Sequence, residues 1–194
     1  MSARVGLPTL VGECCTLRPL RLGDAASLQR HADDPAVAYN LFDGFPQPYT
    51  LALAEAWCGH EHLAPAFAHV LGVVVERDEV AGCISVTPQT GLWSSSAVVG
   101  YWLGQAYWGR GVMSEALTLV SAWAWGALPQ TTRLWMPIYA RNAGSQGVAR
   151  RAGYRLEGRL ELAIRKQGVA IDAVRYGLTR PGATPGRVLP TLAA

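Results

Sequence analysis

The sequence predicts an α+β fold in which helices cover the faces of a mixed β-sheet. Two patterns lead to this prediction. Strand and helix patterns alternate in the second half of the chain, and elsewhere consecutive strands are separated by short turns and pair as hairpins. Half of the 194 residues are hydrophobic and 16% are charged, so the chain can bury a core and is too apolar to be disordered.

The first elements are expected to be short. An edge strand over 16–20 is closed by its proline, and a helix begins at Asp24, where apolar side chains follow at helical spacing. The Asp-Pro pair at 34–35 breaks this helix. Residues 40–49 contain one glycine and two prolines and are expected to form a loop, after which Thr50 caps a second helix.

Three strands are expected next. Segments 67–75 and 80–87 are rich in β-branched residues and are separated by the charged turn 76–79, so they predict a hairpin. The segment 95–103 follows as a third long strand.

After Gly111 the hydrophobic residues change to the spacing of a helix, which predicts a helix that ends at Pro129. Its core face is expected to carry Met113, Leu117, Val120, Ala124 and Ala127. Its opposite row is expected to carry Ser114, Thr118, Ser121 and Trp125. This row is polar except for the tryptophan, which is expected to stay exposed or to meet a partner.

The last third of the chain predicts a strand, a short helix and a hairpin. The expected ranges are 133–139 for the strand, 142–152 for the helix, and 154–163 and 170–179 for the hairpin. The hairpin turn is expected at 165–168. Residues 1–180 are expected to form a single domain, and 181–194 a flexible tail that contains proline and glycine.

Composition excludes several classes of protein. The 17 Lys and Arg against 14 Asp and Glu give a net charge of +3, scattered without the basic run of a nucleic-acid binder. The most apolar helical run, 116–128, is shorter than the ~20 residues of a membrane span, and no signal-peptide core forms at the N-terminus. The four cysteines do not have the spacing of a secreted disulfide framework, so we expect reduced thiols in a cytoplasmic protein.

A glycine loop joins the strand over 95–103 to the helix after it. Gly109 and Gly111 leave room for a close ligand, and the first helical turn directs free N–H groups and the positive end of the helix dipole outward. This arrangement predicts a phosphate or pyrophosphate site. The loop lacks the lysine of a P-loop and the acidic ribose ligand of a dinucleotide fingerprint. The alternative is a connection that binds nothing.

Further motifs surround this loop. They are Phe-Pro-Gln-Pro-Tyr-Thr at 45–50, Gly-Tyr-Trp-Leu-Gly at 100–104, Tyr-Trp-Gly-Arg-Gly at 107–111, Asn142-x-x-Ser145, Arg-Arg-Ala-Gly-Tyr at 150–154, and the terminal hairpin with Asp172. Together and in this order they resemble the GNAT superfamily of acyl-CoA-dependent N-acetyltransferases. Within it they are most similar to the branch of RimJ- and RimL-type ribosomal-protein N-terminal acetyltransferases.

The resemblance implies a twisted, mixed, mostly antiparallel sheet of about six to seven strands with helices on both faces. This sheet would splay open between the strands at 98–103 and 133–139, and coenzyme A would lie in the opening. The pantetheine arm would pair with the backbone near Leu103, and the pyrophosphate would lie on the N–H groups from 108 to 114.

The implied contacts to acetyl-CoA are Leu103, Gly104, Trp108, Gly109, Arg110, Gly111, Val112, Met113, Ser114, Asn142, Ser145 and Arg151. The family pattern Gln/Arg-x-x-Gly-x-Gly/Ala falls on 108–113, and this chain departs from it at Trp108 and Met113. Because backbone groups bind the anion, we expect the site to survive these two differences.

The resemblance also implies that Ser145 gives a proton to the departing thiolate and that Asn142 holds the pantetheine amides. The local sequence alone favours a simpler interpretation, in which Asn142 is a helix N-cap and Ser145 an ordinary first-turn residue. Many relatives carry a general base, a glutamate, where this chain has Val98. Candidate substitutes are His31, Asp43, His69 and Glu161. Alternatively, the reaction proceeds mainly because the amine is held close to the thioester, and water takes the proton of the amine. The general base stays unassigned.

The implied activity is direct transfer of an acetyl group from acetyl-CoA to a primary amine, on a protein N-terminus, an antibiotic, a metabolite or a polyamine. Residues 40–50 and 165–168 are expected to select this acceptor. The alternatives are a protein that binds acyl-CoA without catalysis, and a transferase of succinyl or another acyl group. No metal is expected, because the Cys-Gly-His-Glu-His run at 58–62 has no second cluster. The helix that carries Trp125 suggests a homodimer.

Overall fold

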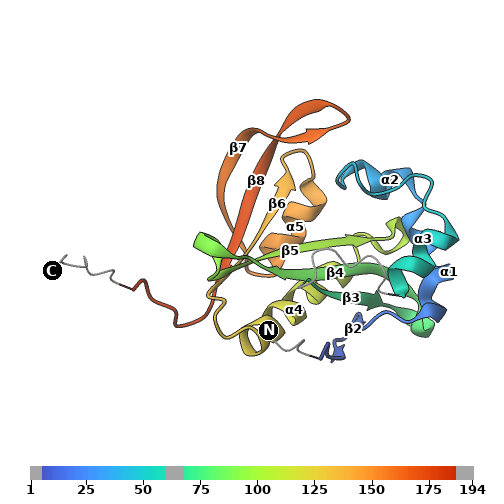
Figure 1. The fold of residues 1–194 in the computed structure, drawn as a ribbon, viewed down its shortest axis with the longest axis horizontal. Coiled ribbons are helices and arrows are strands. Elements are labelled where there is room, and N and C mark those ends of the chain that lie inside the picture. Colours follow the sequence, from blue (N-terminus) through green and yellow to red (C-terminus); the bar gives the residue numbers. More distant parts are fainter. Residues whose placement is uncertain (1–5, 60–67, 187–194) are drawn as a thin grey trace.

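The computed structural model describes residues 6–59 and 68–186 (Figure 1). In this part of the chain, eight strands form one sheet in the order β1-β2-β3-β4-β5-β6-β8-β7. They are β1 (Leu10–Val11), β2 (Thr16–Arg18), β3 (His69–Val74), β4 (Val80–Pro88), β5 (Ser96–Leu103), β6 (Arg133–Tyr139), β7 (Arg155–Lys166) and β8 (Val169–Thr179). Neighbouring strands are antiparallel except β5 and β6. The predicted α+β fold is therefore confirmed, with one strand more than the upper limit expected.

Helices cover both faces of this sheet, as predicted. The helices are α1 (Ala25–Ala32), α2 (Pro35–Tyr39), α3 (Leu51–Cys58), α4 (Val112–Ala127) and α5 (Ala143–Arg151). One hydrophobic core joins α4 and α5 to the sheet, and a second joins α1 and α3 to the opposite face. None of the helices in the described residues is long and apolar enough to cross a membrane.

One expectation about the N-terminal segment is wrong, and one helix in it was not predicted. The strand over 16–20 is not at the sheet edge, because Leu10–Val11 pairs along its outer side. The Asp-Pro pair breaks the first helix as predicted, but it also starts the unpredicted α2, where the Asp34 side chain accepts a hydrogen bond from the Ala36 N–H. Proline is well suited to this first helical position, where its missing N–H would have no partner. Thr50 caps α3 as predicted and accepts from the Leu53 N–H.

The apolar face of α4 is confirmed at four of its five positions. Met113, Leu117, Val120 and Ala124 are buried, whereas Ala127 is half-buried at the helix end. Ser121 departs from the predicted solvent-facing row. It is buried, donates to the Leu117 carbonyl, and shares a 2.8 Å hydrogen bond with the Tyr154 hydroxyl.

Trp125 is covered within its own chain. The ring is half-buried against the core, and the Arg180 guanidinium lies 5.4 Å from its centroid. This contact removes the observation that suggested a dimer, so self-association stays a prediction without support from this residue.

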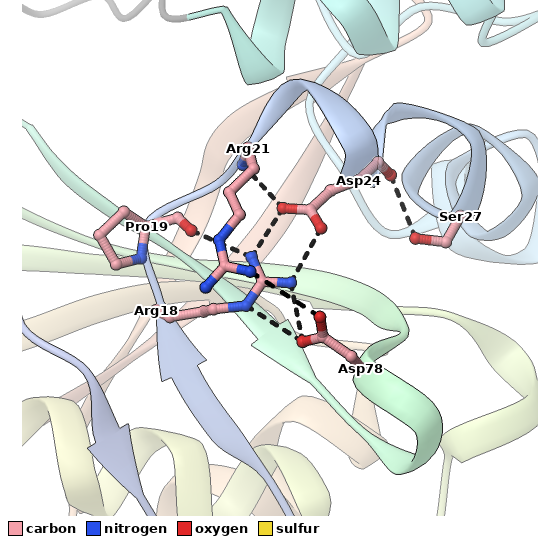
Figure 2. Close-up of polar contacts among 6 residues, drawn as sticks. All are labelled: Arg18, Pro19, Arg21, Asp24, Ser27 and Asp78. Atoms are coloured by element: carbon pink, nitrogen blue, oxygen red, sulfur yellow. Dashed lines mark hydrogen bonds and ion pairs between the residues drawn. The ribbon is translucent and has the colours of Figure 1, made fainter.

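A buried ion-pair network fixes the corner between β2 and α1 (Figure 2). The Arg18 guanidinium, with 4% of the residue exposed, makes two hydrogen bonds to Asp24, of 2.7 and 2.9 Å, and reaches Asp78 in the β3–β4 turn. Asp24 also accepts from the Arg21 N–H. Burial acts to raise the pKa of Asp24, and Arg18 and the Arg21 N–H outweigh it, so that the pKa lies below its usual value. The network therefore ties α1 to the β3–β4 turn.

The terminal hairpin is longer than expected. Strand β7 extends to Lys166, so the turn shortens to Gln167 and Gly168, both with positive φ. Positive φ at both central residues is typical of a two-residue type I′ turn. Of the predicted tail, residues 181–186 form no helix or strand, and 187–194 lie outside the described residues.

The sheet opens at its parallel pair. Strands β5 and β6 pair at three positions, ending at Val98 and Trp135, although β5 continues to Leu103 and β6 to Tyr139. In Figure 1 the strands β6 to β8 rise steeply from the nearly horizontal β3 to β5. The predicted splay between these two strands is therefore present in the structure.

Candidate functional site

The open half of β5 directs backbone groups into the splay. Hydrogen-bonding directions alternate along an antiparallel strand, and the Gly104 N–H donates to Ala81 of β4. Leu103 therefore directs its N–H and carbonyl away from β4. The carbonyl accepts a 2.7 Å hydrogen bond from the Trp108 indole N–H. The Leu103 N–H lies beyond the last residue of β5 that pairs with β6, so it is available to a ligand.

A cradle of backbone N–H groups follows this strand. Within the described residues, the N–H groups of Gly109, Arg110, Gly111, Val112 and Met113 have no hydrogen-bond acceptor in the protein. Gly109 and Gly111 have φ of 75° and 82°, and an added Cβ at either position would meet nothing within 4 Å. Five donors at the positive end of the 16-residue α4, with open space beside them, suit a phosphate or pyrophosphate.

Side chains on both sides of this cradle fit an anionic ligand. Arg110 is exposed, with its guanidinium 5.4 Å from the centroid of the Tyr107 ring. Arg151, in the last turn of α5, donates from Nε to the Ser114 hydroxyl at 3.2 Å and so lies beside the first turn of α4. Met113 is one of the two departures from the family pattern. Its side chain is buried in the core, and its backbone N–H is one of the five groups of the cradle.

Ser145 lies across the splay from β5. The Asn142 side chain caps α5 and accepts from the Ser145 N–H at 3.0 Å, as the local sequence predicts. The Ser145 hydroxyl lies 2.8 Å from the Tyr101 hydroxyl on β5, and Tyr101 also donates to the Ser145 carbonyl. Burial raises the pKa of Tyr101 to about 12, so this hydroxyl stays protonated at neutral pH. The serine is thus held in place from two elements.

Residues 15–155 match the family described as the Acetyltransferase (GNAT) domain, which is more than half of the chain. The chain belongs to the GNAT acetyltransferase family. The predicted family and class of enzyme are therefore confirmed.

Individual relatives of this GNAT chain agree with the family match. The "Probable N-acetyltransferase YjcK" of Bacillus subtilis (strain 168) is 33% identical over 86 residues, which span 44% of this chain and 47% of YjcK. The chain thus matches about half the length of this curated relative.

Solved structures share the fold. RimL, the ribosomal L7/L12 alpha-N-protein acetyltransferase, in complex with coenzyme A, is 20% identical with a TM-score of 0.76, covering 91% of this chain and 100% of RimL. Mycobacterium smegmatis RimJ in complex with CoA-disulfide is 21% identical with a TM-score of 0.76, covering 89% of this chain and 87% of RimJ. At this identity the likeness shows the fold alone, and it agrees with the predicted resemblance to the RimJ and RimL branch.

Three of the four residues proposed as substitutes for the missing GNAT base contact other side chains or backbone groups. His31 shares a 2.8 Å hydrogen bond with Glu79, and Asp43 accepts from the Gln167 N–H and pairs with Lys166. His69 packs edge-on against Trp123 of α4, and burial lowers its pKa. Glu161 is exposed on the edge strand β7. Val98 is half-buried at the last paired position of β5. A general base stays unassigned.

A polar network that the sequence did not indicate supports the cradle loop. Glu79, in the β3–β4 turn, accepts from Arg30 and from the Tyr107 hydroxyl and also pairs with His31. Tyr107 precedes the cradle by two residues, and the His31 ring lies beneath Gly104, where an added Cβ would meet it at 2.6 Å. These contacts tie the loop 104–108 to α1, and no sequence motif connects the three segments involved.

Glu115 is a second residue that sequence reasoning missed. In the first turn of α4, its carboxylate accepts hydrogen bonds of 2.7, 2.7 and 3.0 Å from the N–H groups of Glu13, Cys14 and Cys15. The adjacent cysteines thus belong to a turn that is hydrogen-bonded to α4, the helix that follows the cradle loop. An acidic residue in the first turn of a helix was the available signal, since it suits the helix dipole.

Within the described residues, no group of three or more His, Cys, Asp or Glu side chains is placed to hold a metal ion. His60, Glu61 and His62 of the run at 58–62 lie outside those residues. Cys58 itself is buried at the end of α3.

Proposed function

We propose that this GNAT chain transfers an acetyl group from acetyl-CoA to a primary amine in one direct step. The observation that carries the proposal is the cradle of free N–H groups at 109–113, which lies at the end of the strand that borders the splay. A pyrophosphate on this cradle would lead a pantetheine arm along the open edge of β5 toward Ser145. Arg110 and Arg151 would then meet phosphate charge, and the Leu103 N–H would face an amide or the thioester carbonyl.

The reactive end of this path supports acyl transfer. Ser145 occupies the first turn of α5, where the helix dipole stabilises a developing thiolate. Its hydroxyl is the candidate that gives the thiolate a proton, and we propose Ser145 as a catalytic residue on this basis. Because His31, Asp43 and His69 have other partners and Glu161 is exposed on the edge strand β7, we propose that the amine loses its proton to water after proximity has brought it to the thioester.

The cysteines support direct transfer rather than an acetylated enzyme. Burial raises the pKa of the Cys15, Cys58 and Cys83 thiols, and of Cys58 to about 11, so they lack the thiolate that a nucleophile needs. Cys14 is exposed but lies in the turn held by Glu115. All four are free thiols, which supports the reducing, cytoplasmic setting that we propose.

For the acceptor we propose the α-amine of a peptide or protein N-terminus, by likeness to RimL, with antibiotic, metabolite and polyamine amines as alternatives. The two segments expected to select it meet in the structure. Lys166, at the end of β7, donates to the Leu41 carbonyl at 2.7 Å and pairs with Asp43 of the 40–49 loop. A transferase of succinyl groups and a protein that binds without catalysis remain the alternatives, and the family match favours neither.

The test measures coenzyme A release from acetyl-CoA and from succinyl-CoA with three pools: short peptides with free N-termini, small primary amines, and polyamines. Coenzyme A is quantified by chromatography, because the exposed Cys14 would react with a thiol reagent. We expect release with acetyl-CoA in the peptide pool, and initial rates that show both substrates bound before product leaves. Binding of acetyl-CoA without release in any pool would identify a non-catalytic binder.

A further inference from the structure

A tyrosine–serine contact crosses the opening of the sheet. Tyr101 lies on β5 beyond Val98, where pairing with β6 has stopped, and Ser145 lies on α5. Their hydroxyl oxygens are 2.8 Å apart, and the Tyr101 hydroxyl is also 3.2 Å from the Ser145 carbonyl. Tyr101 can therefore donate either to the serine hydroxyl or to the serine carbonyl.

These two donor positions define what the serine proton can do. When Tyr101 donates to the carbonyl, the serine hydroxyl donates to Tyr101 and its own proton is engaged. When Tyr101 donates to the serine oxygen, the serine proton is free to point at a third group. Since burial keeps the tyrosine protonated, Tyr101 retains an O–H that it can turn to the serine oxygen, which frees the serine proton; a phenolate could only accept that proton.

We infer that Tyr101 is a positioning residue for proton delivery to the coenzyme A sulfur, acting through the Ser145 hydroxyl. The inference rests on the proposed function and adds to it a residue on the strand opposite Ser145. Asn142 fixes the serine main chain and Tyr101 fixes its hydroxyl, so the proton donor is held before the thioester arrives. Such preorganisation matters because a small displacement of a proton donor lowers the rate strongly.

The step balances without a further reactant. The amine nitrogen forms a bond to the thioester carbonyl carbon, the carbon–sulfur bond breaks, and its electron pair leaves on sulfur. Ser145 gives its proton to that sulfur while Tyr101 turns its O–H from the serine carbonyl to the serine oxygen. The proton lost by the amine enters solvent, and a solvent proton restores the serine hydroxyl.

The chain supplies a matched control for this inference. Tyr154 and Ser121 form a second tyrosine–serine pair with the same 2.8 Å separation, buried between α4 and the end of α5. Tyr101→Phe and Tyr154→Phe each remove one hydroxyl from such a pair and keep the ring. We expect Tyr101→Phe to lower kcat by about tenfold with the KM for acetyl-CoA within twofold of wild type. Tyr154→Phe is expected to leave kcat unchanged.

The double variant, Tyr101→Phe with Ser145→Ala, distinguishes a role of Tyr101 in positioning the serine hydroxyl from a role in packing. Ser145→Ala is expected to lower kcat by about a hundredfold, and Tyr101→Phe should lower it no further in the Ser145→Ala background. A Tyr101→Phe enzyme with wild-type kcat, an equal loss in both serine backgrounds, an equal loss for Tyr154→Phe, or a raised KM alone would each overturn the inference. Calorimetric titration with acetyl-CoA verifies that each variant still binds. Absence of transfer by the wild-type enzyme with every amine would instead overturn the proposed function, and the inference with it.

Discussion

At the scale of single residues, Glu79 shows how one carboxylate links separate parts of the chain. Hydrogen bonds from Arg30 and His31 lower the pKa of Glu79 to about 2, and they outweigh burial, which raises it. A carboxylate with a depressed pKa in the folded state stabilises the protein above its unfolded pKa of about 4.3, and this contribution is lost as the pH falls toward 2.

The depressed pKa of Glu79 predicts how the free energy of unfolding changes with pH. In the wild-type protein the free energy of unfolding should fall between about pH 5 and pH 2, and in Glu79→Gln it should fall less steeply over that window. Urea unfolding at a series of pH values measures both slopes. Equal slopes for the two proteins would mean that Glu79 does not contribute through its charge.

Sequence reasoning identified residues whose partners are close along the chain. Asn142 could be predicted as the cap of α5, because its acceptor and the Ser145 N–H are three residues apart. The partners of Tyr101 and Glu115 are 44 and about a hundred residues away. No local pattern indicates such contacts, so the partners of both residues became visible only in the folded chain.

At the scale of elements, the hydrogen bonds from the 12–15 turn to Glu115 of α4 form a clamp that makes a testable contribution to stability. Glu115→Ala leaves three backbone N–H groups without their carboxylate, so we expect the free energy of unfolding to fall by about 2 kcal/mol. Urea denaturation measures this change. Glu161→Ala, at an exposed position on β7, is the control and should change the free energy little. The same small change for both variants would contradict the role of the clamp.

The link between the terminal hairpin and the 40–49 loop makes a prediction about the acceptor. Lys166→Ala removes the donor that holds the Leu41 and Ala38 carbonyls and the partner of Asp43. We expect the KM for the amine to rise severalfold, while the dissociation constant for acetyl-CoA stays the same. Arg155→Ala, an exposed position at the opposite end of β7 and outside the 165–168 segment, is the control. A change in acetyl-CoA affinity, or an unchanged KM for the amine, would contradict this role.

The predictability of an element depended on the strength of its pattern. Helix α4 and the hairpin of β3 and β4 have a clear period and were predicted nearly to their ends, whereas β7 continues to Lys166 beyond its predicted end at 163. The five-residue α2 and the two-residue β1 are too short to show a period. Ser121 was misplaced because its polar side chain suggested solvent, but Tyr154 and the Leu117 carbonyl satisfy it inside the protein.

At the scale of the whole molecule, the order of motifs along the chain predicted more than any one motif. The glycine loop alone was compatible with a connection that binds nothing. The splay between β5 and β6 brings the loop, the open edge of β5 and the first turn of α5 to one opening. The sequence could not give the shape of the proposed acceptor surface, because that shape would depend on contacts between distant segments such as Lys166 and the 40–49 loop.

We propose that the backbone cradle at 109–113 binds the pyrophosphate of acetyl-CoA, and this can be tested directly. Gly111→Trp would fill this cradle, and Gly91→Trp is the control, because Gly91 also has a positive φ and open space but lies at the opposite end of β5. Calorimetric titration with acetyl-CoA should give micromolar binding, on the order of −8 kcal/mol, for the wild type and for Gly91→Trp. Binding should be lost in Gly111→Trp. Wild-type affinity in a folded Gly111→Trp protein, or no binding by the wild type, would contradict the account.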